Sequence, residues 1–113
     1  MHVDEKNLCV LFPAARKGLN PNEITIAEIL KNEGYRTMCI GKWHLGDHPD
    51  FMPTNQGFDS YFGIPYSNDM NRKQVPLPLV RDLTVIRDSV QRDDTITEQY
   101  TKEAVKFLSL IHI

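Results

Sequence analysis

The chain has 113 residues, of which 41% are hydrophobic, and its 13 basic and 15 acidic side chains give a net charge of −2. This length fits one domain or part of one, and the composition does not require disorder. The charge balance provides no broad cationic surface, so we expect no nucleic-acid partner. The apolar runs are only a few residues long, whereas a membrane-spanning helix needs about 20 apolar residues. We therefore expect no membrane span.

The N-terminal region offers few signals. Its first ten residues are charged and polar where a secretory signal would place its apolar stretch, so no signal peptide is expected. The short apolar run from Leu8 to Phe12 ends at Pro13 and predicts a strand or extended entry, and residues 14–22 predict a loop. Cys9 and Cys39 do not form a disulfide scaffold. We expect both to be small buried apolar groups, and their pairing stays open.

A helix is expected from about Ile24 to Glu33. Thr25 and Glu28 have the spacing of a capping box, in which each side chain bonds the other residue's backbone amide. Gly34 stands where a glycine commonly ends a helix. The spacing of the apolar residues predicts a stripe that faces the core. The stripe comprises Ile26, Ile29 and Leu30.

A strand and a long loop are expected after this helix. Tyr35 to Ile40 is rich in β-prone residues between Gly34 and Gly41. Helix, glycine, strand and glycine in this order are typical of an α/β layer. From His44 to Met70 the chain contains three glycines, three prolines and five aromatic residues. Such a composition predicts an ordered, irregular loop packed through its aromatic rings, followed by a linker over residues 71–78.

The C-terminal third predicts a short strand and a second helix. The strand is expected at Leu83 to Ile86, and the helix from Thr97 to about Leu110, with a capping-box spacing between Thr95 and Glu98. The acidic pair Asp93–Asp94 precedes this helix, where it favours the helix dipole rather than a catalytic role. The helix also has a stripe that we expect to be core. It comprises Tyr100, Ala104, Val105 and Leu108.

The densest polar cluster is the segment from Gly41 to Gly46, directly after the expected strand. Ligands in open α/β sheets bind beyond the carboxyl ends of strands. Lys42 offers a point charge for an anion, and His44 can exchange a proton near neutral pH. The alternative is a solvated lysine, a satisfied loop histidine and a packing role for Trp43. The residues alone leave both interpretations open.

Two other chemistries are not favoured by the spacing. A Walker phosphate loop needs four residues between its glycines and Ser or Thr after its lysine, but six residues separate Gly34 from Gly41, and Trp43 follows the lysine. Asn68 and Asp69 fall short of the six to eight oxygens that calcium takes. Four residues could ligate a transition metal, but no second cluster of ligands follows them in the sequence. No transition-metal site is therefore expected. The four residues are His44, Asp47, His48 and Asp50.

Four stretches resemble the sulfatase family, in its arylsulfatase A and N-acetylgalactosamine-6-sulfatase types. GYRTMCIGKWHLG, residues 34–46, resembles the second signature of the family, and ITIAEILKNEGY, residues 24–35, is similar to the helix before it. QGFDSYFGIPYSND, residues 56–69, is similar to the downstream segment, and YTKEAVKFL, residues 100–108, to the following helix. The four occur in the family's order.

The resemblance implies an alkaline-phosphatase-like α/β sandwich that hydrolyses sulfate esters with a formylglycine nucleophile and calcium. By position, Lys42 corresponds to the lysine that contacts the sulfate. His44 corresponds to the histidine hydrogen-bonded to the formylglycine, and Ser67 to a serine that lines the sulfate site. A fixed ammonium can stabilise the charge that develops on the sulfate oxygens, and a histidine can orient the hydrated aldehyde or move a proton.

The chain also departs from the family pattern. Formylglycine is made from Cys or Ser in a C/S-x-P-x-R motif, which is absent here, and neither Cys9 nor Cys39 has that context. The resemblance therefore implies that residues 1–113 are an internal fragment of the catalytic domain, without the nucleophile loop and the C-terminal metal ligands. We expect the fragment to be inactive alone and to expose unpaired strand edges and apolar faces.

The alternatives are a phosphatase or phosphodiesterase of the same superfamily, and a non-enzymatic interaction module that binds through the aromatic loop. Family members are often exported, but the sequence leaves the localisation and the oligomeric state open.

Overall fold

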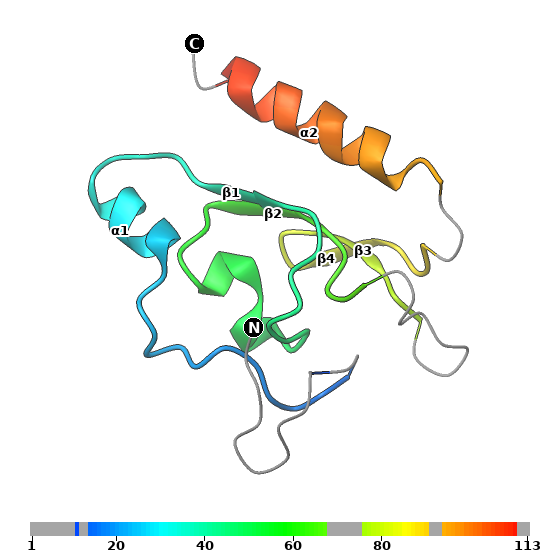
Figure 1. The fold of residues 1–113 in the computed structure, drawn as a ribbon, viewed down its shortest axis with the longest axis horizontal. Coiled ribbons are helices and arrows are strands. Elements are labelled where there is room, and N and C mark those ends of the chain that lie inside the picture. Colours follow the sequence, from blue (N-terminus) through cyan, green and yellow to red (C-terminus); the bar gives the residue numbers. More distant parts are fainter. Residues whose placement is uncertain (1–10, 12–13, 68–75, 91–93, 111–113) are drawn as a thin grey trace.

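The computed structural model describes residues 11, 14–67, 76–90 and 94–110, and its centre is a four-stranded mixed sheet (Figure 1). The strands lie in chain order and are β1 (Met38–Ile40), β2 (Ser60–Gly63), β3 (Leu79–Arg81) and β4 (Thr84–Arg87). β1 and β2 are parallel, and the other two pairs are antiparallel. The α/β class predicted from the sequence is confirmed.

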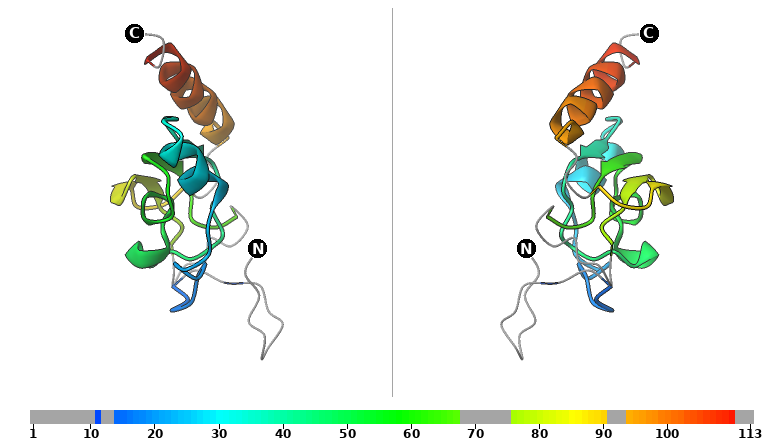
Figure 2. Two further views of the ribbon diagram at one scale, coloured as in Figure 1. Left: turned by 90° about the vertical axis from the view of Figure 1, so that its left-hand side faces the viewer. Right: turned by 90° about the vertical axis from the view of Figure 1, so that its right-hand side faces the viewer.

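Helices lie on both sides of this sheet. α2 (Ile96–Leu110) crosses one face, and two short 3₁₀ helices, η1 (Pro49–Phe51) and η2 (Pro53–Asn55), lie on the other side (Figures 1 and 2). Side chains alternate across a strand, so each face of the sheet has its own core. The core on the α2 side comprises Leu11, Phe62, Ile64, Tyr66, Leu77, Leu79, Val90 and Ile96. The opposite core comprises Met52, Tyr61 and Val80.

The first helix, α1 (Ile26–Asn32), has the ends that the sequence predicts. Thr25 and Glu28 form the capping box, with both reciprocal hydrogen bonds present. At the other end Gly34 has a φ of 87°, and its amide donates to the Lys31 carbonyl. The left-handed conformation is one that glycine adopts without steric cost. The helix begins two residues later than predicted.

The apolar stripe predicted for α1 is wrong as a core. Ile26 and Ile29 are 71% and 54% exposed, and Ala27 is the buried residue of the helix. The reason is that α1 rests its first turn on the 56–57 segment, where the Thr25 hydroxyl donates to the Gln56 carbonyl. Lys31 also pairs with Asp59 at 3.1 Å, while the side of the helix that bears Ile26 and Ile29 is left exposed. The expected exposure of apolar faces is thereby confirmed.

The strands differ from the prediction more than the helices do. β1 is shorter than the predicted 35–40 strand, and β4 lies one residue later than predicted. β2 lies inside the stretch predicted as an irregular loop, and β3 directly follows the predicted linker. The prediction for the loop is correct in one respect, because its aromatic residues Tyr61, Phe62 and Tyr66 are buried. The strand predicted at residues 8–12 lies largely outside the described residues.

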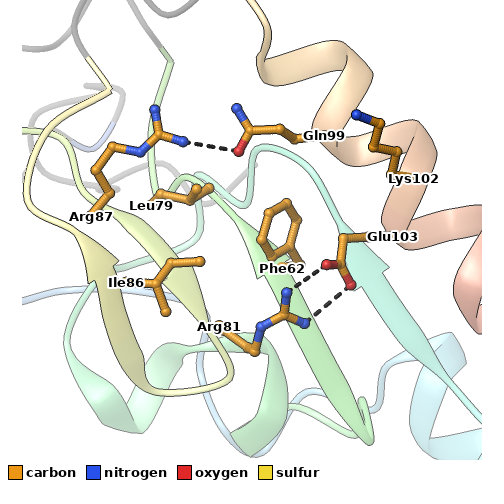
Figure 3. A pocket seen from close by; sticks show the side chains of 8 residues that line it. All are labelled: Phe62, Leu79, Arg81, Ile86, Arg87, Gln99, Lys102 and Glu103. Carbon is orange, nitrogen blue, oxygen red and sulfur yellow. Dashed lines mark hydrogen bonds and ion pairs between the residues drawn. The ribbon is translucent and has the colours of Figure 1, made fainter.

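An ion pair and a ring contact attach α2 to the sheet (Figure 3). The Arg81 guanidinium donates two hydrogen bonds to the Glu103 carboxylate, at 2.5 and 3.1 Å. The same guanidinium lies 4.8 Å from the centre of the Phe62 ring, and Tyr100 packs on that ring edge to face. Bidentate geometry and a cation–π contact make this a strong point of attachment.

The helix stripe predicted for α2 is only half buried. Tyr100 and Ala104 are half-buried, and Tyr100 packs against the core, but Val105 and Leu108 are exposed. In the second half of the helix, Phe107 and Leu110 line a hollow together with Met38 of β1 and Ser60 of β2. No helix in the described parts of the chain is long and apolar enough to cross a bilayer.

We expect Glu103→Gln to destabilise the fold in a pH-dependent manner. The Arg81 guanidinium holds the pKa of Glu103 below its ordinary value of 4.5. The pair therefore stabilises the fold above pH 4.5, and this contribution is lost as the pH falls through the lowered pKa. Urea denaturation at pH 7 should show a loss of roughly 0.5–1 kcal/mol, since Arg81 is 40% exposed and partly screened.

The control is Glu98→Gln, which breaks the exposed pair between Glu98 and Lys102 on the same helix. It should change stability less than Glu103→Gln at pH 7, and the two effects should converge at low pH, where both carboxyls are protonated. Equal effects of the two substitutions would contradict the proposed attachment.

Candidate anion-binding site

The segment that follows β1 continues to pair with the segment that follows β2. The amides of Gly41, Trp43 and His44 donate to the carbonyls of Phe62, Ile64 and Pro65, at 2.9, 3.1 and 2.7 Å. The Lys42–His44 segment is therefore held beside the segment that leads to Ser67. Both segments lie beyond the carboxyl ends of parallel strands, where α/β sheets bind ligands.

A close backbone approach makes this pairing possible. Gly63 lies opposite Gly41, and a side-chain carbon at Gly63 would overlap the Gly41 carbonyl. The fully buried Tyr61 donates its hydroxyl to the same carbonyl at 3.0 Å. Burial raises the pKa of Tyr61, so its hydroxyl stays a donor. This contact fixes the backbone directly before Lys42.

Trp43 is a packing anchor, as one of the two interpretations of the sequence proposed. Its indole nitrogen donates to the Phe51 carbonyl at 2.8 Å, and its ring meets Phe58 edge to face. It also packs against the core around Met52. Trp43 thus attaches the Lys42–His44 segment to the 3₁₀ helices, in addition to the backbone pairing with the segment after β2.

His44 is buried and held in an uncommon conformation. Its side chain is 7% exposed, and its φ is 61°. The Nε2 atom lies 3.0 Å from the Leu11 carbonyl oxygen, and the Tyr66 ring packs on the imidazole edge to face at 5.0 Å between centroids. The Nδ1 atom is buried and has no hydrogen-bond partner among the described residues.

Lys42 and Ser67 are more accessible than His44. Lys42 is exposed and pairs with no acid in the described part of the chain, and Ser67 is half-buried. The structure thus brings the three residues predicted as site residues onto two neighbouring segments. Their roles toward a ligand stay predictions.

The other candidate ligands have structural roles. An Asp47 carboxylate oxygen accepts a hydrogen bond from the Ala14 amide, and the exposed His48 accepts one from the Asp50 amide. The described residues contain no group of three or more His, Cys, Asp or Glu that could hold a metal ion. Asn68 and Asp69 lie outside the described residues.

Cys39 is not a nucleophile at neutral pH. Its thiol is free and half-buried, and desolvation raises its pKa to about 11. Since the thiolate is the reactive form, this thiol is unreactive. Cys39 instead packs against the core around Tyr61, as predicted for a small apolar group. Cys9 and Asp93 lie outside the described residues.

A hollow of about 290 Å³ lies elsewhere, between α2 and strands β2 to β4 (Figure 3). Its basic side chains already have partners: Arg81 pairs with Glu103, Arg87 with Gln99, and Lys102 with Glu98. It contains none of the predicted site residues. We therefore assign it to the packing of α2 rather than to the anion site.

Two supporting residues of the site were not predicted from the sequence. Tyr61 holds the Gly41 carbonyl, and Tyr66 packs on His44. Both tyrosines lie in the stretch predicted as a packed aromatic loop, and only the pairing of β1 with β2 reveals which ring supports which residue.

Comparison with known proteins identifies the family. A family model described as Sulfatase matches residues 4–112. The chain belongs to the sulfatase family. Mouse arylsulfatase G is 37% identical over 80% of this chain, human arylsulfatase A 40% over 67%, and mouse N-acetylgalactosamine-6-sulfatase 31% over 84%. This chain spans 23%, 19% and 20% of those proteins, so it corresponds to about a fifth of a sulfatase.

Solved structures show the same fold. The crystal structure of Ps i-CgsB superposes with a TM-score of 0.70 over 88% of this chain, at 24% identity, and the chain covers 26% of it. A complex of the same protein with k-i-k-neocarrahexaose gives a TM-score of 0.71. The predicted membership in an alkaline-phosphatase-like α/β sandwich, of which this sulfatase chain contains one part, is confirmed.

We expect Tyr61→Phe to weaken the strand pairing behind the site. The substitution keeps the buried ring but removes the hydrogen bond to the Gly41 carbonyl, which should cost about 1–3 kcal/mol because a buried acceptor loses its partner. Chemical denaturation followed by tryptophan fluorescence would measure the loss through Trp43. Tyr35→Phe is the control, since Tyr35 is exposed, and an equal effect of both would contradict the role of Tyr61.

Proposed function

We propose that this chain supplies one wall of the sulfate-binding site of a sulfuric ester hydrolase. The observation that supports the proposal most is the pairing of the Lys42–His44 segment with the Ser67 segment at the carboxyl ends of β1 and β2. The chain's membership in the sulfatase family supports the chemistry. The matched relatives are sulfatases by name, so a phosphatase or an interaction module is not favoured.

Each of the three side chains has a role that fits its environment. The exposed ammonium of Lys42 is available to stabilise charge on the sulfate oxygens during S–O cleavage. The Ser67 hydroxyl is a donor for a sulfate oxygen. The buried imidazole of His44 suits orientation of a nucleophile or transfer of a proton. The relatives are named for different substrates, as arylsulfatase A and N-acetylgalactosamine-6-sulfatase. The proposal therefore names the substrate class only as a sulfate ester.

Calcium and formylglycine are implied by the family resemblance, but the residues present do not fit them. The described residues offer no group of metal ligands, and the 113-residue sequence contains no C/S-x-P-x-R motif. We propose that other segments of a longer sulfatase provide both groups.

Sulfate binding by Lys42 is directly testable. Titration of the ¹⁵N-labelled chain with inorganic sulfate should shift the amide signals of residues 42–44 and 67. Lys42→Ala should remove these shifts, because the ammonium supplies the attraction to the anion. Lys106→Ala is the control, since Lys106 is an exposed lysine of α2. Shifts that persist in Lys42→Ala would contradict the assignment.

We expect the chain by itself to hydrolyse no sulfate ester. The reason is that its one described thiol is protonated and no formylglycine motif is present. Incubation with calcium and a chromogenic aryl sulfate, followed by absorbance, checks this. Turnover that Lys42→Ala abolishes would show that the chain contains a complete site. An in-frame C/S-x-P-x-R codon pattern upstream in the gene would support a longer active protein.

A further inference from the structure

The strained conformation of His44 requires restraint by its neighbours. Residues with a side chain seldom adopt a left-handed conformation, and His44 has a φ of 61°. Its amide is held by the Pro65 carbonyl at 2.7 Å, and its side chain is buried. Such strain persists only where the surrounding structure fixes the residue, and it is found preferentially at functional sites.

The hydrogen bond to Leu11 determines which nitrogen of the imidazole has the proton. A carbonyl oxygen accepts hydrogen bonds and donates none. Because Nε2 lies 3.0 Å from the Leu11 oxygen, Nε2 must be the donor. In the neutral ring Nδ1 then has no proton and is an acceptor. A buried acceptor without a partner is costly, and Nδ1 has none among the described residues.

Tyr66 restrains the same ring from another side. Its side chain is fully buried in the core that also contains Leu11 and Ile64. Its ring meets the imidazole at 75° and 5.0 Å between centroids, the edge-to-face arrangement that aromatic pairs prefer. Tyr66 directly follows Pro65, whose carbonyl holds the His44 amide. One short segment therefore fixes both the backbone and the ring of His44.

We infer that Tyr66 is a positioning residue for His44, which together with the Leu11 carbonyl fixes the imidazole as the Nε2–H tautomer and leaves Nδ1 as an acceptor. The role of this tautomer at the sulfate site rests on the proposed function. An unprotonated Nδ1 pairs with a hydroxyl donor and repels a sulfate oxygen, which is also an acceptor. Direct contact with the sulfate then falls to Lys42 and Ser67, and His44 serves a hydroxyl-bearing group.

Nitrogen chemical shifts of the imidazole test this inference. The 113-residue chain is labelled with ¹⁵N-histidine, and two-bond ¹H–¹⁵N spectra are recorded without sulfate at about pH 8, above the ordinary histidine pKa. His44→Gln identifies the His44 signals. The same chain unfolded in concentrated urea is the reference for a ring that exchanges between tautomers. We expect a protonated Nε2 and an unprotonated Nδ1 in His44, with a wider separation of the two shifts than in the unfolded chain.

Variants of Tyr66 then test the positioning role. Tyr66→Phe keeps the ring contact and should keep the separation of the His44 shifts. Tyr66→Leu removes the ring and should reduce the separation toward that of the unfolded chain. Tyr35→Leu, at an exposed tyrosine, should change nothing. If circular dichroism shows that Tyr66→Leu has lost the fold, Tyr66→Met takes its place.

A protonated Nδ1, or shifts averaged as in the unfolded chain, would overturn the tautomer assignment. An unchanged separation in Tyr66→Leu would overturn the role of Tyr66. Because these spectra contain no sulfate, their outcome is independent of the sulfate titration. Failure of the proposed function would appear only as missing shifts in that titration.

Discussion

The parallel pairing of β1 with β2, prolonged past the end of both strands, is the constraint on which the site depends. Three backbone hydrogen bonds carry the pairing forward to His44. This continuation requires glycine at residue 63, where any side chain would meet the Gly41 carbonyl. It places Lys42 and His44 on one segment and Ser67 on the end of the neighbouring segment. The strands thus determine the composition of the site before any ligand binds.

The same pairing separates two environments within three residues. Lys42 extends into solvent, where it is accessible to an anion, while His44 is enclosed by Tyr66 and the Leu11 carbonyl. Trp43 divides them and anchors the segment to Phe51. The ammonium of Lys42 needs access to solvent, whereas the ring of His44 needs a fixed, buried orientation. Two positions of one short segment provide both environments.

The sequence predicts the helices well because their ends have local signals. The capping box at Thr25 and the left-handed Gly34 bound α1 without help from the rest of the chain. β2 has no such signal, since Tyr61 and Phe62 are buried on opposite faces and show no alternation of polarity. The burial of His44 was also unpredictable, because it depends on the distant residues Leu11 and Tyr66. The exposure of Ile26 shows the converse: an apolar stripe predicts a core only where a neighbour covers it.

These features explain why a wall of a site can be well formed and yet do no chemistry. Reaction requires a nucleophile held about 3–3.5 Å from the reacting atom, and the described thiol of Cys39 is protonated and packed in the core. Binding that is equal for substrate and transition state does not raise the rate of the chemical step. Lys42 can attract a sulfate, but it accelerates cleavage only when a nucleophile makes charge develop on the oxygens beside it. The exposed apolar faces of α1 and α2 fit the same proposal, in which further segments of a longer sulfatase complete both the contacts and the chemistry, since this chain spans about a fifth of its curated relatives.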